Sequence, residues 1–150
     1  MLFEKIIDIN IECQSKYKID HSRDAFYAIG ELIKLSQELE CEYKKLGEKL
    51  GKKAGSLNNL SLNKINNMLN SENKISSKDY DNLKQVIKIR NYINHWYFIN
   101  DFAESYERQE KILNICYMIL SEGSDVVNNL IDNINGVGVV RPTIFDSQNN

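Results

Sequence analysis

Three polar residues in the second half of the chain have types and spacing that suit phosphate chemistry. Arg90 is followed directly by Asn91, and His95 comes four residues later. Arginine can hold a phosphate with two parallel hydrogen bonds and stabilise negative charge that grows on it. An imidazole titrates near neutral pH, so it can take the proton of a ribose 2′-hydroxyl or protonate a leaving 5′-oxygen. This motif therefore predicts metal-free RNA cleavage, with Asn91 orienting the imidazole or a phosphate oxygen.

The segment that carries the motif is predicted to be a helix with two different faces. At about 100° per residue, four large apolar side chains share the face expected to point to the core: Val86, Ile89, Ile93 and Trp96. The opposite face is a polar stripe of Lys84, Lys88, Asn91 and His95. We expect the two lysines to contact RNA phosphates. The alternative is an ordinary solvated face with an incidental histidine.

A single helix does not bring the two reactive side chains together. Arg90 lies on the flank between the two faces, and it is about 140° from His95 on an ideal helix. A two-fold dimer would place two copies of the motif opposite each other and form one cleft with two arginines and two histidines. No cluster of carboxylates accompanies the motif, so a two-metal nuclease is not expected. We expect a homodimer that needs no metal or other cofactor.

Arg90, Asn91 and His95 resemble the motif of the HEPN superfamily, in which an arginine and a polar residue precede a histidine after a short gap. His95 and Tyr97 also resemble the His-x-Tyr extension of HepT-type toxins. Residues 24–32 are similar to an early helix of that family, and the resemblance covers about residues 2–120. It implies a homodimeric, metal-independent endoribonuclease that acts as the toxin of a toxin–antitoxin or phage-defence system.

The same resemblance implies a regulator and a second class of function. In HepT-type systems a nucleotidyltransferase antitoxin adds AMP to the motif tyrosine, which corresponds to Tyr97. On the wheel Tyr97 lies about 20° from Arg90, so an added phosphate would occupy the guanidinium. The alternative is a core-edge tyrosine whose hydroxyl reaches water. Other HEPN proteins are inactive, so the second hypothesis is a non-catalytic helical interaction module in a defence or regulatory complex.

The elements that must position the motif are predicted to be helices throughout, with no strand pattern. The clearest is residues 23–50, which carries a seam with alternating steps of three and four: Ile29, Leu32, Ser36, Leu39, Tyr43, Leu46 and Leu50. Ser61 and Ser76 are predicted caps, and Gly123 is predicted to end a helix. The expected helices are residues 2–17, 23–50, a short one after Ser61, 76–99, 102–121 and 125–134. Loops are expected at residues 51–56 and 70–75.

The predicted fold class is an all-α, up-and-down, HEPN-like bundle of five to six helices over residues 1–134, with a flexible tail over residues 135–150. A chain of 150 residues fits one domain. Its net charge of −2 means that RNA must be bound by a local patch. No signal peptide or membrane-spanning run is seen, so a cytoplasmic protein that does not contact the membrane is expected.

Several other polar residues have mainly structural interpretations. The three cysteines are expected to be free thiols, and His21 is expected in a turn. A basic cluster near the end of the second helix is expected to be solvated, or to track RNA: Lys44, Lys45, Lys49, Lys52 and Lys53. Residues 137–145 are expected to be disordered, or to dock on a partner.

Overall fold

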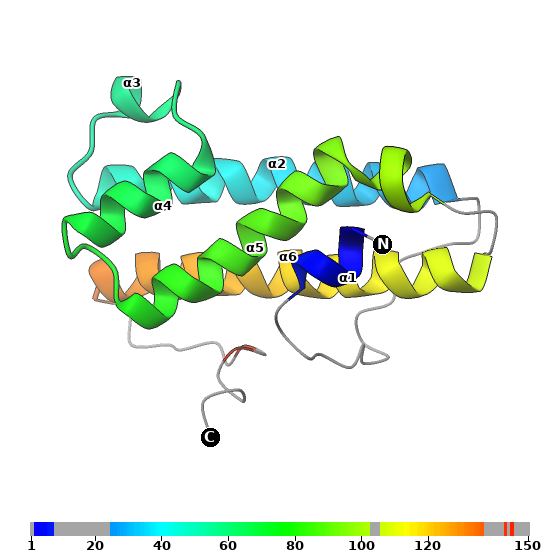
Figure 1. Ribbon diagram of the computed structural model, residues 1–150. Coiled ribbons are helices and arrows are strands. Elements are labelled where there is room, and N and C mark those ends of the chain that lie inside the picture. The colour runs from blue at the N-terminus through cyan, green and yellow to red at the C-terminus, as the bar shows by residue number, and fades with distance from the viewer. Residues whose placement is uncertain (1, 8–24, 103–105, 137–142, 144, 146–150) are drawn as a thin grey trace.

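The computed structural model describes residues 2–7, 25–102, 106–136, 143 and 145, and over these residues it contains helices and no strand. The helices are α1 Leu2–Ile6, α2 Ala25–Lys49, α3 Ala54–Leu57, α4 Leu62–Ser71, α5 Ser77–His95, a π-helical turn Tyr97–Asp101, and α6 Tyr106–Ile134. The predicted all-α class is therefore confirmed. Figure 1 shows α2 and α6 side by side, with α5 packed against both.

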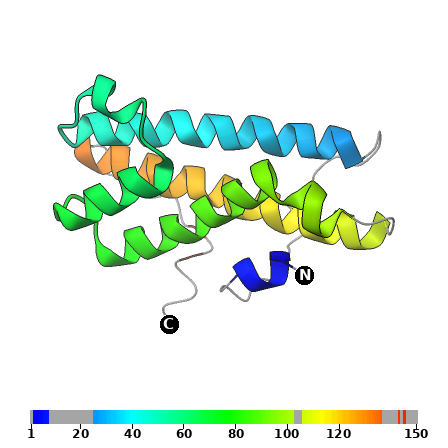
Figure 2. The same ribbon diagram turned by 45° about the horizontal axis from the view of Figure 1, so that its top comes forward.

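The seam predicted for the second helix forms one side of the core. Of its seven residues, Leu50 is partly buried and the other six are buried. Ser36 is the polar member, and its hydroxyl donates to the Leu32 carbonyl oxygen at 2.9 Å, which satisfies the group without breaking the helix. The partner along this seam is chiefly α6, with α5 and α4 beside it (Figure 2).

Both predicted serine caps are present, and they fix where α4 and α5 begin. The Ser61 hydroxyl accepts from the Lys64 backbone N–H at 3.3 Å, and Ser76 accepts from the Asp79 N–H at 3.0 Å. Each bond satisfies a backbone donor that has no partner inside its own helix. The start of α5 matters for function, because it sets the register of the motif at the other end.

The prediction that Gly123 ends a helix is wrong. Residues 106–134 form the single helix α6, and Gly123 is buried in its middle. A Cβ atom on Gly123 would lie 2.4 Å from Cγ1 of Val86 on α5. Glycine is therefore needed here for the close approach of two helices and not for a left-handed turn.

The loops predicted at residues 51–56 and 70–75 are each wrong in part. The helix α3 begins at Ala54, inside the first loop, and α4 continues to Ser71, inside the second. Leu57 of α3 is fully buried, and a Cβ on Gly47 would lie 2.9 Å from its side chain. The first predicted helix is present over residues 2–6 as α1, which ends before Ile7. Its remaining residues, 8–17, lie outside the described residues, as does His21.

Two other observations concern the fold as a whole. Within the described ranges, no helix has the length and apolar content needed to cross a membrane.

The last helix ends at Ile134 as predicted, and beyond it Phe145 is buried with the core. The division into residues 1–134 and 135–150 stays a prediction.

Candidate functional site

Arg90 is held in a fixed position between α5 and α2. One guanidinium nitrogen donates to Glu40 Oε2 at 2.6 Å, and another donates to Asn91 Oδ1 at 3.1 Å. The Arg90 side chain keeps only 19% of its exposure. Its Nε is buried and has no hydrogen-bond partner among the described residues. Asn91 therefore orients the arginine, whereas the sequence predicted that it would orient the histidine or a phosphate oxygen.

Glu40 is a site residue that the sequence did not reveal. It accepts from Lys44 at 3.0 Å as well as from Arg90, so one carboxylate joins two cations. The Lys44 hydrogen bond and the Arg90 charge lower the pKa of Glu40, against the opposing effect of burial. The pair Glu40–Lys44 has helical spacing that a sequence can show. Its link to Arg90 spans 50 residues and could not be seen there.

The four residues of the polar stripe on α5 differ in their exposure to solvent. Lys84 and His95 are exposed, while Lys88 and Asn91 are partly buried. The Lys84 ammonium also lies 6.0 Å from the centroid of the Tyr80 ring. His95 occupies the last turn of α5, so its imidazole is presented to solvent at the end of the helix.

Trp96 was predicted to lie in the core, and this is wrong. Its side chain is 48% exposed. The reason is that α5 ends at His95, and Trp96 has φ −122° and ψ −23°, outside the α-helical region. The predicted helix continued to residue 99, so Trp96 and Tyr97 were both placed as if they belonged to the same helix as Arg90.

Tyr97 is displaced from its predicted place for the same reason. It begins the π-helical turn and is fully buried, and its hydroxyl donates to Gln109 Oε1 at 3.0 Å. The sequence predicted that the Tyr97 hydroxyl would lie either in a cleft or in water, and this buried contact differs from both. The predicted role of Tyr97 as an AMP acceptor is untested, and in this conformation it would require the turn to open first.

Contacts with α1 hold the π-helical turn in place. The buried carboxylate of Asp101 accepts from the Phe3 backbone N–H at 3.1 Å, and the Phe3 ring lies 5.4 Å from Tyr92. Burial, with smaller effects from Cys116 and Asp101, raises the pKa of Tyr92 above its ordinary range. Burial also raises the pKa of the free thiol of Cys116, which leaves it uncharged.

The surface beside His95 is apolar and aromatic. The π-helical turn and the residues next to it expose several large side chains, with Ile99 the most exposed at 76%. They are Phe26, Trp96, Phe98, Ile99 and Phe102. Contiguous exposed apolar patches are typical of interaction sites.

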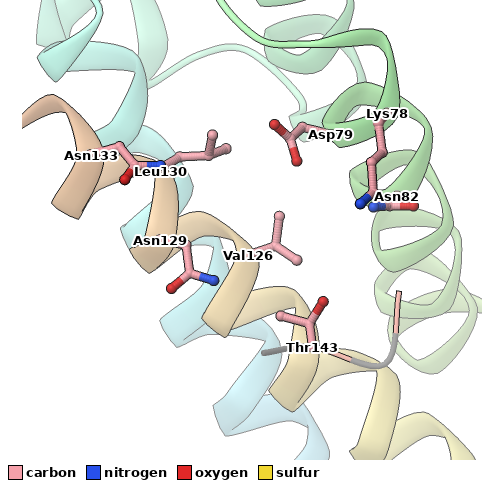
Figure 3. Close-up of a pocket in the computed structure, with 8 residues that line it drawn as sticks. All are labelled: Lys78, Asp79, Asn82, Val126, Asn129, Leu130, Asn133 and Thr143. Atoms are coloured by element: carbon pink, nitrogen blue, oxygen red, sulfur yellow. The ribbon is translucent and has the colours of Figure 1, made fainter. Parts of the chain in front are cut away.

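A separate small pocket lies between the first turns of α5 and the last turns of α6 (Figure 3). Its volume is about 160 Å³, and its lining comprises Lys78, Asp79, Asn82, Val126, Asn129, Leu130, Asn133 and Thr143. Along the axis of α5 it is about 24 Å from His95, so it is not part of the motif site. Within the described part of the chain, no three His, Cys, Asp or Glu side chains lie close enough to hold a metal ion.

Comparison with known proteins adds no family to this description. No protein-family model, curated protein or solved structure matches the chain.

Proposed function

We propose that this chain is a metal-independent endoribonuclease of the HEPN class, with a HEPN-like bundle, that acts in the cytoplasm as the toxin of a toxin–antitoxin or phage-defence system. The observation that carries the proposal is the arrangement at the end of α5. Arg90 is fixed by Glu40 and Asn91, and His95 is exposed on the same helix. A fixed guanidinium and an exposed imidazole are the two groups that this chemistry needs.

In the proposed reaction, one imidazole takes the proton of the ribose 2′-hydroxyl, and the 2′-oxygen attacks the adjacent phosphorus. The bond to the 5′-oxygen breaks, and a second imidazole protonates that oxygen. Arg90 stabilises the charge that develops on the phosphate. Glu40 is a positioning residue, because it acts on the reaction only through the guanidinium that it holds.

The two imidazoles come from two copies of the chain in this proposal, since each chain supplies one His95. The exposed surface next to His95 supports a dimer through this region. The side chains of Trp96 and Ile99 are exposed directly after His95. Aromatic and large apolar residues are enriched at the centres of protein interfaces.

The direct test is cleavage of total RNA by the purified chain, with and without EDTA. We expect cleavage in both conditions, and at least a hundredfold loss with His95→Ala or Arg90→Ala, as is typical for removal of an acid–base or charge-stabilising group. Lys111→Ala, an exposed lysine on α6, is the matched control and should keep full activity. Full activity of the His95 variant, or a strict need for added Mg²⁺, would refute the mechanism.

One observation favours a second candidate, a non-catalytic interaction module. Arg90 is already paired with a carboxylate, as a purely structural arginine would be. This alternative predicts no cleavage of RNA by the wild-type chain and stable binding to a partner through the apolar surface beside His95.

A further inference from the structure

Three phenylalanines from two distant parts of the chain form one exposed group beside the motif. Phe98 and Phe102 have ring centroids 5.2 Å apart, and Phe26 of α2 lies 5.7 Å from Phe98 and 5.8 Å from Phe102. We call these three residues the phenylalanine cluster. They remain 46%, 42% and 64% exposed in the order Phe98, Phe102 and Phe26. Each ring therefore packs against the other two and still presents a large part of its surface to solvent.

The cluster rests on a rigid base. Buried Tyr97 packs edge-on against Phe98 at 5.5 Å and against Phe102 at 6.1 Å. The hydroxyl of Tyr97 is fixed by Gln109, and the end of its turn is fixed by the bond between Asp101 and Phe3. Rings that are held this way lose little rotamer entropy when a flat ligand stacks on them.

The segment that leads to the cluster is cationic, although the whole chain is acidic. Between Asp81 and Asp101 there is no aspartate or glutamate, while the segment contains Lys84, Lys88 and Arg90, of which Arg90 pairs with Glu40 of α2. The net charge of the chain is −2. This local charge complements a polyanion.

From this combination of rings and charge, we propose that the phenylalanine cluster stacks the unpaired bases of a nucleic-acid strand whose phosphates lie along α5. The inference rests on the proposed function, and it deepens that proposal by naming the substrate as unpaired RNA. Bases inside a duplex have their faces covered, whereas unpaired bases can stack on aromatic side chains.

The test compares two fluorescently labelled strands of equal length. One is a single-stranded oligodeoxynucleotide, which lacks the 2′-hydroxyl and so survives the proposed reaction. The other is an abasic strand with the same phosphates and no bases. Fluorescence anisotropy should show that the wild type binds the strand with bases at least tenfold more tightly, as expected for one or two stacked bases.

The decisive variant is Phe98→Leu combined with Phe102→Leu, which keeps apolar bulk and removes the aromatic faces. We expect the preference for bases to disappear while abasic-strand binding stays unchanged. Phe98→Trp should retain the preference. Trp96 is the only tryptophan of the wild type, so a change of its fluorescence on binding would place the strand beside His95.

Two results would overturn the proposal. One is an unchanged preference for bases in the double leucine variant. The other is an equal loss of affinity for both strands, together with conversion of a dimer to a monomer. That result would show that the cluster binds a second copy of the chain. Failure of the nuclease proposal would be distinguishable from failure of the stacking proposal. In that case RNA would stay intact although the chain still bound the strand with bases more tightly.

Discussion

At the scale of single residues, the state of Arg90 decides how the site works. The guanidinium is half-buried, and Glu40 and Asn91 hold it before any substrate is present. A pre-oriented arginine costs less entropy when it meets a phosphate. The carboxylate that holds it also lowers its net attraction for that phosphate, so Glu40 affects both orientation and charge.

Replacement of Glu40 by glutamine should separate these two effects. Glu40→Gln keeps a side-chain oxygen near Arg90 and removes the negative charge. We expect RNA to bind more tightly, seen as a lower KM, and kcat to fall by about tenfold because the guanidinium is less firmly oriented. Steady-state kinetics on a defined RNA will measure both. Glu38→Gln, at an exposed carboxylate on the same helix, is the control and should change neither constant.

The same carboxylate predicts a pH dependence of stability. Because the pKa of Glu40 is lower in the folded chain than its ordinary value of 4.5, its stabilising contribution is present above about pH 4.5. The contribution is lost as the pH falls through the folded pKa. Urea unfolding should therefore show that wild type exceeds Glu40→Gln in stability at pH 7 and that the difference shrinks near pH 3. A constant difference at both pH values would contradict this assignment.

The buried hydroxyl of Tyr97 predicts a stability effect that is independent of any antitoxin. Tyr97→Phe removes the hydrogen bond to Gln109 and leaves a buried amide oxygen without this donor. We expect a loss of about 1–3 kcal/mol in the free energy of unfolding. Denaturant unfolding measures this loss. Phe98→Leu, at an exposed ring that carries no polar group, is the control.

At the scale of elements, the helix ends explain what the sequence could and could not predict. The seam of α2 and the caps at Ser61 and Ser76 were predicted correctly, because periodicity and capping are local properties. The end of α5 at His95 and the passage of α6 through Gly123 were missed. Both depend on packing between distant segments, and the position of Trp96 and Tyr97 followed from the first error.

The close contact at Gly123 gives a test with a matched control. Gly123→Ala should destabilise the fold by about 1–3 kcal/mol, because its Cβ would overlap Val86 even though alanine favours helices. Gly30→Ala on α2 has no atom within 4 Å of the new Cβ, so it should stabilise by about 0.5–1 kcal/mol. Thermal or urea unfolding compares the two. Equal effects of the two alanines would show that α5 and α6 do not approach as described.

At the scale of the whole molecule, the proposed site needs two chains. Light scattering at tens of micromolar should report a dimer, since an interface of standard size persists at that concentration. We expect Ile99→Asp to produce monomers with little RNA cleavage and an unchanged helix content, because a charge would be buried at the interface. A monomeric wild type with full activity would exclude a shared cleft.

A mixing experiment tests the shared cleft more directly. Arg90→Ala and His95→Ala should each be inactive alone, and the mixed dimer keeps one arginine and one histidine in its cleft. Because this dimer has a single imidazole, water must make one of the two proton transfers, and we expect mixing to restore only a small fraction of the cleavage rate after subunits have exchanged. Mixing Arg90→Ala with itself under the same treatment is the control. No recovery despite proven exchange would indicate that the reaction needs both copies of each group.

The bond between Phe3 and Asp101 also bears on the order in which the chain folds. The two residues are 98 positions apart, so this contact closes one of the longest loops in the described structure. Non-local contacts form late, after nearer ones have reduced the entropy of closure. During synthesis on the ribosome, α1 must therefore wait for most of the chain before it can dock. The turn after His95 is then among the last parts to become rigid, and a nascent chain would carry an unfinished site until that moment.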